Sequence, residues 1–436
     1  MIQQFKLWFN NNRTWIYTVQ YIFYSVLLLI LVSLVDLNYA PIDRFIPDFL
    51  YTKVSLARTV LTTLAGSLLT ITTFTFSTIL TVLNMYATNY TPRSIQNFTN
   101  EKITMKILGI YIGGFFYCVS ALLFVRDASD ERLVISGTIA IFYSIFSIIY
   151  FVIFVQKVLA SIQSVNIIGD IFQESLPAIE EEIEERTSTK EYAVEEGWYD
   201  LRIKCPMNGY LSVIDFEGLT NALKDYKGIL NIQVKIGDYL IKDLPVAKLS
   251  LNEQPDDEEK LQESLTKYFL LQDSKVQASD YRYGISKLVE VAIRGMSSGI
   301  KDPNTAVHCV RKISILLSKL AAIDDYHILK AQGDSCEIFY TSYSLDEDLY
   351  NAFFQIIHYG HTDVSITRGV LEGLYAIYSL ATDKNKKIIE QYAAYIYDII
   401  KETFHSPLDL DYLNAVYYRI NPEDADIEGE MKAWNV

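Results

Sequence analysis

Long apolar runs separated by short polar stretches fill the first third of the chain. Four of these runs, at 15–35, 56–85, 105–125 and 133–155, each reach the roughly 20 residues that a helix needs to cross about 30 Å of hydrocarbon. Buried helices of soluble proteins rarely combine this length with so few charges. The pattern therefore predicts four transmembrane helices, and it makes the lipid bilayer the first partner of the protein.

The rest of the chain changes pattern twice. Residues 157–186 have the periodicity of a helix that leaves the membrane and ends in the acidic run 180–185, which is typical of a solvated face. Alternating apolar and polar residues within 201–250 indicate short strands, and helical periodicity then returns. The predicted fold class is an α-helical membrane protein. Its parts are a four-helix transmembrane domain (1–156), a helical neck and linker (157–200), a small β module (201–251) and an α-helical cytoplasmic domain (258–436).

Charge is divided unevenly along the chain. Residues 1–156 carry 10 Lys and Arg against 7 Asp and Glu, and the remainder carries 28 against 46, so a net charge of +3 is followed by one of −18. The acidic region lacks the basic footprint of a nucleic-acid-binding protein, and its average charge opposes binding to anionic lipid. The four cysteines are widely spaced, which is typical of a reducing compartment and not of a disulfide framework.

An even number of spans places both termini on one side of the membrane. Six Lys and Arg residues flank that side, against five on the other. This excess slightly favours a cytoplasmic N-terminus under the positive-inside rule, and the acidic C-terminal region agrees with it. We therefore expect both termini in the cytoplasm.

The second apolar run is the most informative segment. It holds twelve hydroxyl residues between Thr59 and Thr88, and ten of them fall on one side of a helical wheel. Lipid offers hydroxyl groups no partners, so this side should face protein or water. Two interpretations remain open: helix–helix packing through small residues, and a water-lined path formed when several copies present this side to a common axis. The candidate pore-lining residues are Thr59, Thr63, Ser67, Thr70, Ser77, Thr81 and Asn84.

Two arginines mark the boundaries of this second run. Arg58 opens it, and Arg93 follows it. Arginines at such positions usually anchor a helix by extending their charged ends to the membrane surface. The alternative interpretation is a ring of arginines at the mouth of a pore, which would favour anions.

The C-terminal region contains one conspicuous helix start. Asp302 or Asn304 is suited to cap the helix, Pro303 fits its first turn, and Thr305 follows. Helix capping explains the pattern, although free backbone N–H groups at a helix start can also hold an anion.

Neither a metal site nor a catalytic centre is indicated. His358 and His361 form the only close histidine pair, and they lack a third ligand at a familiar spacing. Phosphate-loop and dinucleotide-binding motifs are missing from the sequence. We therefore expect no metal, no cofactor and no catalytic residue, and hence no enzyme.

Several short motifs resemble those of a large family of bacterial inner-membrane proteins of unknown function. They are Ala57-Arg58-x-x-Leu61-x-x-Leu64-Ala65-Gly66-Ser67, Phe76-Ser77, Pro92-Arg93, and Leu108-Gly109 leading to Tyr117-Cys118. The stretch 284–306 is similar to the family's most specific soluble signature. The resemblance implies a multi-pass protein of the bacterial inner membrane with a large cytoplasmic domain.

The resemblance also covers the β module, and the sequence departs from the family pattern at several positions. Residues 209–238 are similar to the barrel-sandwich hybrids of lipoyl-type domains, but without a modifiable lysine in a Met-Lys-Met hairpin. Glu101-Lys102 stands where the family pattern has Asp-Arg, and Met105 replaces a Gln. Gln156-Lys157 lies where relatives often have paired histidines, so no role for such a pair is carried over.

The sequence thus predicts an oligomeric membrane channel or conduit for ions or small solutes. The second helix would line the path in a homo-oligomer, and the cytoplasmic domain would gate it. The alternative is a non-conducting membrane scaffold or sensor that recruits a cytoplasmic partner. The conduit is expected to bind a small ion, and neither the conduit nor the scaffold is expected to bind nucleic acid.

Overall fold

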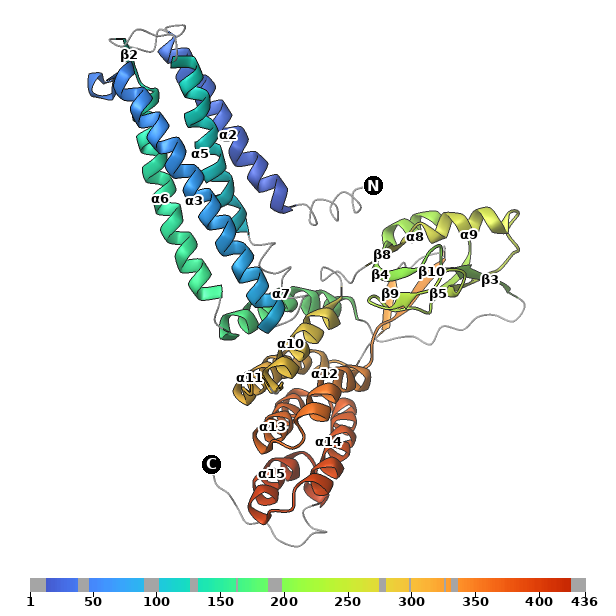
Figure 1. Cartoon of the computed structure of the whole chain (residues 1–436). Coiled ribbons are helices and arrows are strands. Elements are labelled where there is room, and N and C mark those ends of the chain that lie inside the picture. Colours follow the sequence, from blue (N-terminus) through green and yellow to red (C-terminus); the bar gives the residue numbers. More distant parts are fainter. Residues whose placement is uncertain are drawn as a thin grey trace. The chain divides into compact units, whose positions relative to one another are not determined.

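The computed structural model divides into two compact units, Met1–Asn166 and Ile167–Val436, called here the membrane unit and the C-terminal unit (Figure 1). The residues that the structure describes are 13–37, 47–89, 102–125, 132–161, 164–186, 198–273, 280–297, 299–324, 327–330 and 336–424.

Four apolar helices make up the membrane unit. They are α2 (Arg13–Asp36), α3 (Val54–Asn89), α5 (Lys102–Val125) and α6 (Ser136–Ser161). Within the described part of the chain, these four are the helices long and apolar enough to cross a membrane, which confirms the prediction from the apolar runs. Helix α5 packs against each of the other three and is therefore the centre of the unit.

Glycines allow α5 to approach α2 closely. A Cβ atom on Gly109 would lie 3.0 Å from the Cβ of Tyr21, and one on Gly113 would lie 2.3 Å from the Oγ of Ser25. Small residues at such crossings let two membrane helices gain packing contacts that lipid cannot replace. Gly109, one of the family-like positions of the sequence, thus falls at this crossing.

One end of the membrane unit is held together by polar contacts. The carboxylate of Asp36 accepts hydrogen bonds from the backbone N–H groups of Ile135 (2.8 Å) and Ser136 (3.3 Å), and so it caps the start of α6. Two short strands, β1 (Thr52–Lys53) and β2 (Leu133–Val134), pair antiparallel beside the 3₁₀ helix η2 (Asp48–Leu50). The helix ends at this side are therefore fixed relative to one another.

Helix α7 (Ser164–Glu185) is amphipathic, and from Ile167 onward it belongs to the C-terminal unit. Its apolar face is buried at Ile168 and Ile171. It crosses α10 (Tyr281–Met296) closely, because a Cβ on Gly284 would lie only 2.0 Å from the Oγ of Ser175.

The β module consists of two sheets that share one apolar core. The larger sheet has the strand order β3-β7-β5-β10-β9, in which only β5 and β10 run parallel, and the smaller has the order β6-β4-β8. No barrel closes among the described strands, so the likeness to a barrel-sandwich hybrid extends only to the presence of small sheets. The strands are β3 (Tyr199–Lys204), β4 (Gly209–Ile214), β5 (Gly228–Ile232), β6 (Tyr239–Leu240), β7 (Pro245–Leu251), β8 (Phe269–Gln272), β9 (His327–Lys330) and β10 (Glu337–Thr341). Helices α8 (Phe216–Ala222) and α9 (Glu258–Thr266) accompany them.

Strands β8, β9 and β10 lie beyond the 201–251 segment in which the sequence indicated strands. The hairpin β9–β10 lies between two helices of the helical region in the sequence. Its strand β10 pairs with β5 and so adds the hairpin to the larger sheet of the β module.

Antiparallel helices form the remainder of the C-terminal unit. Helices α11, α13 and α15 pack in one row, and α10, α12 and α14 pack in a second row against it (Figure 1). Stacked helix pairs of this kind are typical of helical-repeat proteins. The bounds are α11 (Pro303–Ala321), α12 (Leu345–Gly360), α13 (Val364–Leu380), α14 (Asp383–Thr403) and α15 (Pro407–Ile420).

Candidate functional site

The hydroxyl side of α3 faces away from the rest of the membrane unit. All seven candidate residues are exposed: Thr59, Thr63, Ser67, Thr70, Ser77, Thr81 and Asn84. The opposite side of α3, including Leu61, Leu68 and Thr75, is buried against the other helices. Packing inside one copy of the protein therefore does not account for the hydroxyl side, which we call the hydroxyl face.

Hydroxyl groups of this face donate hydrogen bonds to their own helix. Thr63, Ser67 and Thr70 each donate to the carbonyl oxygen four residues earlier at 2.9 Å, and Thr59 and Thr81 do so at 3.1 and 3.0 Å. Such bonds satisfy the O–H donors within the helix. The lone pairs of the hydroxyl oxygens remain directed outward, so the face presents hydrogen-bond acceptors to its surroundings.

The outward side of α6 has a different character. It exposes aliphatic and aromatic residues such as Phe142, Ile145, Ile149 and Val152, as expected of a helix in contact with lipid tails. Only α3 among the four described membrane helices shows an outward row of hydroxyl residues. Gly66 lies within that row, and a Cβ built on it would meet no atom within 4 Å.

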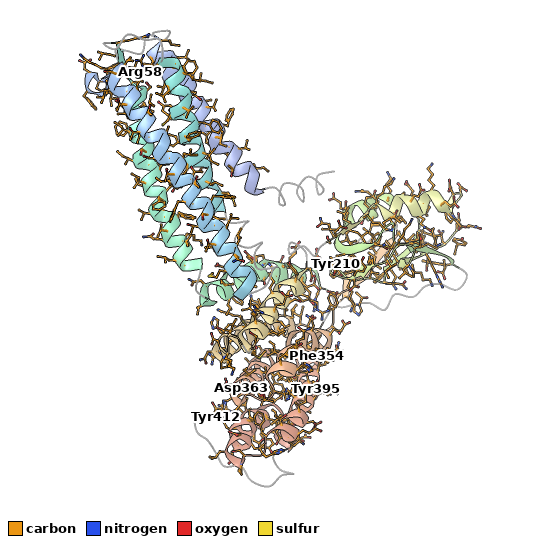
Figure 2. All side chains as sticks on the ribbon, in the orientation of Figure 1. Arg58, Tyr210, Phe354, Asp363, Tyr395 and Tyr412 are labelled. Carbon is orange, nitrogen blue, oxygen red and sulfur yellow. The ribbon has the colours of Figure 1, made fainter. Side chains whose placement is uncertain are left out.

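Arg58 lies near the N-terminal end of α3. Its Nη2 donates a hydrogen bond of 2.9 Å to the carbonyl oxygen of Val125, the last residue of α5 (Figure 2). The side chain thereby joins the ends of two helices, which fits an anchoring residue. Arg93 lies outside the described residues.

Asp302 caps α11. Its Oδ1 accepts a hydrogen bond from the backbone N–H of Thr305 (3.2 Å), its Oδ2 accepts one from the Thr305 hydroxyl (2.6 Å), and Pro303 occupies the first turn. The backbone N–H of Asp302 donates to the carbonyl oxygen of Gly295 at 2.8 Å, which ties the start of α11 to the end of α10. A carboxylate thus already occupies the position in which a helix start would hold an anion.

A buried ionic cluster, which we call the junction, lies where α7, α10 and α12 meet. Asp348 of α12 is its centre, with 1% of the residue exposed. Its Oδ2 accepts a hydrogen bond of 2.8 Å from the Tyr281 hydroxyl, and its Oδ1 lies 3.0 Å from the Nε of Arg282. Burial raises the pKa of Asp348 to about 6, because the loss of hydration outweighs the attraction of the neighbouring arginines.

Arg186 connects the end of α7 to the junction. Its Nε lies 2.9 Å from the Oε1 of Glu182, and its Nη2 donates to the Tyr281 hydroxyl (3.3 Å) and to the carbonyl oxygen of Tyr343 (3.2 Å). Glu182 also accepts a hydrogen bond from the hydroxyl of Ser342. The acidic run 180–185 is therefore only partly a solvated face, since Glu182 has an ionic partner inside the unit.

Tyr343 extends the junction to the β module. Its ring contacts two cations: the Cζ of Arg282 lies 3.8 Å from the ring centroid, and the Nζ of Lys235 lies 4.6 Å from it. Its hydroxyl donates a 3.0 Å hydrogen bond to Asp238 of the β module. Lys235 also forms a 2.6 Å ion pair with Glu347 at the start of α12. Nothing in the local sequence marks these residues, because their partners are distant along the chain.

Four membrane helices, an exposed hydroxyl face and a C-terminal unit with a small β module define a multi-pass membrane protein. Residues 11–376 match the family described as "Predicted membrane protein (DUF2254)", and the chain belongs to it. This confirms the resemblance seen in the sequence motifs.

The chain is also similar to proteins of two mycobacteria. Uncharacterised proteins of Mycobacterium bovis and Mycobacterium tuberculosis are each 21% identical over 356 residues, which is 77% of this chain. The match covers 66% of each relative, so the chain spans slightly less than two thirds of their length. No solved structure matches the chain.

Proposed function

We propose that the protein is an oligomeric conduit for ions or small solutes in the bacterial inner membrane. Several copies would place the hydroxyl face of α3 around a common axis, with both termini in the cytoplasm. The observation that supports the proposal is that this face points away from the other helices of the unit, on a helix apolar enough to cross a membrane. A row of polar groups at that position calls for a neighbour other than lipid.

The chemistry of the face favours water and cations over anions. Its hydroxyl hydrogens are engaged with carbonyl oxygens of α3, and oxygen lone pairs point outward. Oxygen atoms of this kind replace the hydration shell of a cation in selective pores. Arg58 is a cation near one end of α3, and its guanidinium donates a hydrogen bond to the carbonyl oxygen of Val125.

The C-terminal unit supplies a means of gating. Helix α7 directly follows the last membrane helix along the chain, and its end is fixed to α10, α12 and the β module by the junction. A rearrangement of the C-terminal unit would thus act on the segment that leaves the membrane.

Cysteine accessibility and flux in liposomes test the proposal together. Single cysteines at Ser67 and Ser77 are expected to react with a water-soluble maleimide, whereas one at Ile149 on the apolar side of α6 is not. The native cysteines do not interfere, since Cys118, Cys205, Cys309 and Cys336 are buried. Modification at Ser67 should also block flux of K⁺ or Na⁺. Unreactive positions on α3, or flux that equals that of empty liposomes for every ion tried, would refute the conduit.

A membrane scaffold or sensor is the second candidate, and a different feature favours it. Tyr350, Phe354 and His358 stack along the exposed side of α12, with ring centroids 4.9 and 6.0 Å apart. Tyr395 of α14 is also exposed, and Figure 2 marks it together with Phe354. Exposed aromatic residues on a stacked helical array are typical of surfaces that bind protein.

Affinity capture with the full-length protein distinguishes the second function from the first. A scaffold should retain a stoichiometric soluble partner that is lost on Tyr350→Ser with Phe354→Ser, and bulky substitution at Ser67 should not affect it. A conduit should show the opposite dependence, with flux sensitive to Ser67 alone.

A further inference from the structure

Two loops at one end of the β module expose a group of large apolar side chains. The loop 205–208 joins β3 to β4, and the loop 241–244 joins β6 to β7. Met207 is 50% exposed, Ile241 and Leu244 are each 53% exposed, and the adjacent Tyr239 is 58% exposed. We call the two loops the tip. Tyr210, whose ring centroid lies 5.0 Å from that of Tyr239, follows the first of them (Figure 2).

Backbone hydrogen bonds hold the two loops of the tip together. The N–H of Cys205 donates to the carbonyl oxygen of Leu244 at 2.8 Å, and the N–H of Asp243 donates to the carbonyl oxygen of Cys205 at 3.0 Å. The N–H of Lys242 donates to the Oδ1 of Asn208 at 2.8 Å. Asp243 adopts a left-handed conformation, with φ of 68°, to close the second turn. The apolar side chains therefore project from a fixed platform.

The charge of the tip is opposite in sign to the average charge of residues 157–436. Its loops and the preceding strand end carry Arg202, Lys204 and Lys242 against Asp243, and these four side chains are exposed. Residues 157–436 as a whole carry 28 Lys and Arg against 46 Asp and Glu. The average acidity that opposes binding to anionic lipid is thus reversed at this end of the β module.

We propose that the tip docks on the anionic headgroups of the membrane that anchors the chain. Met207, Ile241 and Leu244 would enter the boundary between headgroups and acyl chains, where such aliphatic side chains bind, and Tyr239 has the amphipathic ring that is common at that depth. Lys204 and Lys242 would contact lipid phosphates. Because four membrane helices tether the C-terminal unit to the same bilayer, the membrane surface is present at high effective concentration and the contact needs little intrinsic affinity.

Fluorescence quenching in nanodiscs tests the contact with the full chain. A single cysteine at Ile241 carries an environment-sensitive fluorophore, and the discs contain headgroup-labelled quencher lipid in phosphatidylcholine, with or without phosphatidylglycerol. The matched control is a cysteine at Leu408 on α15, an apolar residue that is 69% exposed. We expect a blue shift and strong quenching at position 241 in phosphatidylglycerol discs, less in phosphatidylcholine alone or at high salt, and neither effect at position 408.

Substitution of the lysines separates lipid docking from other contacts. Each basic residue near an anionic surface strengthens binding about fivefold, so Lys204→Gln with Lys242→Gln should reduce the bound fraction, while the thermal transition stays in place. Equal quenching at positions 241 and 408, or quenching independent of both phosphatidylglycerol and the lysines, would overturn the proposal. So would a blue shift in lipid-free detergent that grows with protein concentration, because that result assigns the tip to a second copy of the chain.

Discussion

Titration of Asp348 provides a sharp test of the junction. An aspartate ordinarily titrates near 3.8, and burial raises the pKa of Asp348 to about 6. The difference of about two pH units corresponds to about 3 kcal/mol, at about 1.4 kcal/mol per unit. Since the folded pKa lies above the unfolded one, the folded protein holds this proton more tightly. The resulting stability is fully present below about pH 4 and is lost as the pH rises through about 6.

The Asp348→Asn variant isolates this effect from the other carboxylates, because its side-chain amide keeps the shape of the carboxylic acid but does not titrate. From about pH 4 to about pH 7, the wild type should lose about 3 kcal/mol of unfolding free energy relative to the variant. For a unit of this size, that corresponds to a relative fall in Tm of about 6 to 12 °C. Calorimetry of the full chain in detergent, repeated along this pH series, measures the difference directly.

An exposed aspartate serves as the matched control. Asp383 has a side chain that is 99% exposed beside Lys386, so Asp383→Asn should leave the pH profile of stability unchanged within about 0.5 kcal/mol. Parallel profiles for the wild type and Asp348→Asn would refute the reasoning. They would mean that Arg186 and Arg282 hold the carboxylate ionised across the whole range, despite its burial.

Five further substitutions test packing and capping. Gly66→Leu should leave the Tm of the single copy unchanged and abolish both assembly and flux. Gly114→Leu should prevent folding, because its Cβ would lie 2.5 Å from a Tyr143 ring atom. Size-exclusion chromatography and circular dichroism compare the two variants. Gly284→Ala should cost about 1 to 2 kcal/mol by overpacking against Ser175, and Ser175→Gly should restore the loss in calorimetry. Asp302→Ala should cost about 1 kcal/mol in the same assay, and an unchanged Tm would show that the cap contributes nothing.

Local patterns in the sequence predicted the features that depend on local chemistry. The four membrane helices follow from apolar runs whose length alone requires them, and the one-sided placement of the hydroxyl residues of α3 follows from the helical period. The sequence predicted a cap at Asp302 or Asn304, and the hydrogen bonds from Thr305 identify Asp302 as the cap. What the pattern left open was whether the hydroxyl side of α3 packs inside one copy, because sequence carries no information on which helix lies next to which.

Features built from distant residues were not predictable. Strand β10 pairs with β5 although about a hundred residues separate them, and its short apolar run at 337–341 lies among helices. The junction joins Glu182 to Ser342 and Tyr281 to Asp348, and each of these residues is ordinary in its own segment. The tip likewise requires two loops to be brought together before its exposed apolar side chains form one surface.

The parallel pairing of β5 with β10 also determines when the β module can be completed during synthesis. Strand β5 ends at Ile232, and its partner begins only at Glu337, after α10 and α11 have been made. At about 5 to 20 residues per second, one edge of β5 waits about 5 to 20 s for its partner strand. A nascent chain in this interval carries an unpaired, apolar strand edge. We therefore expect this edge to be open to aggregation until residue 341 has left the ribosome, unless another segment or a chaperone covers it.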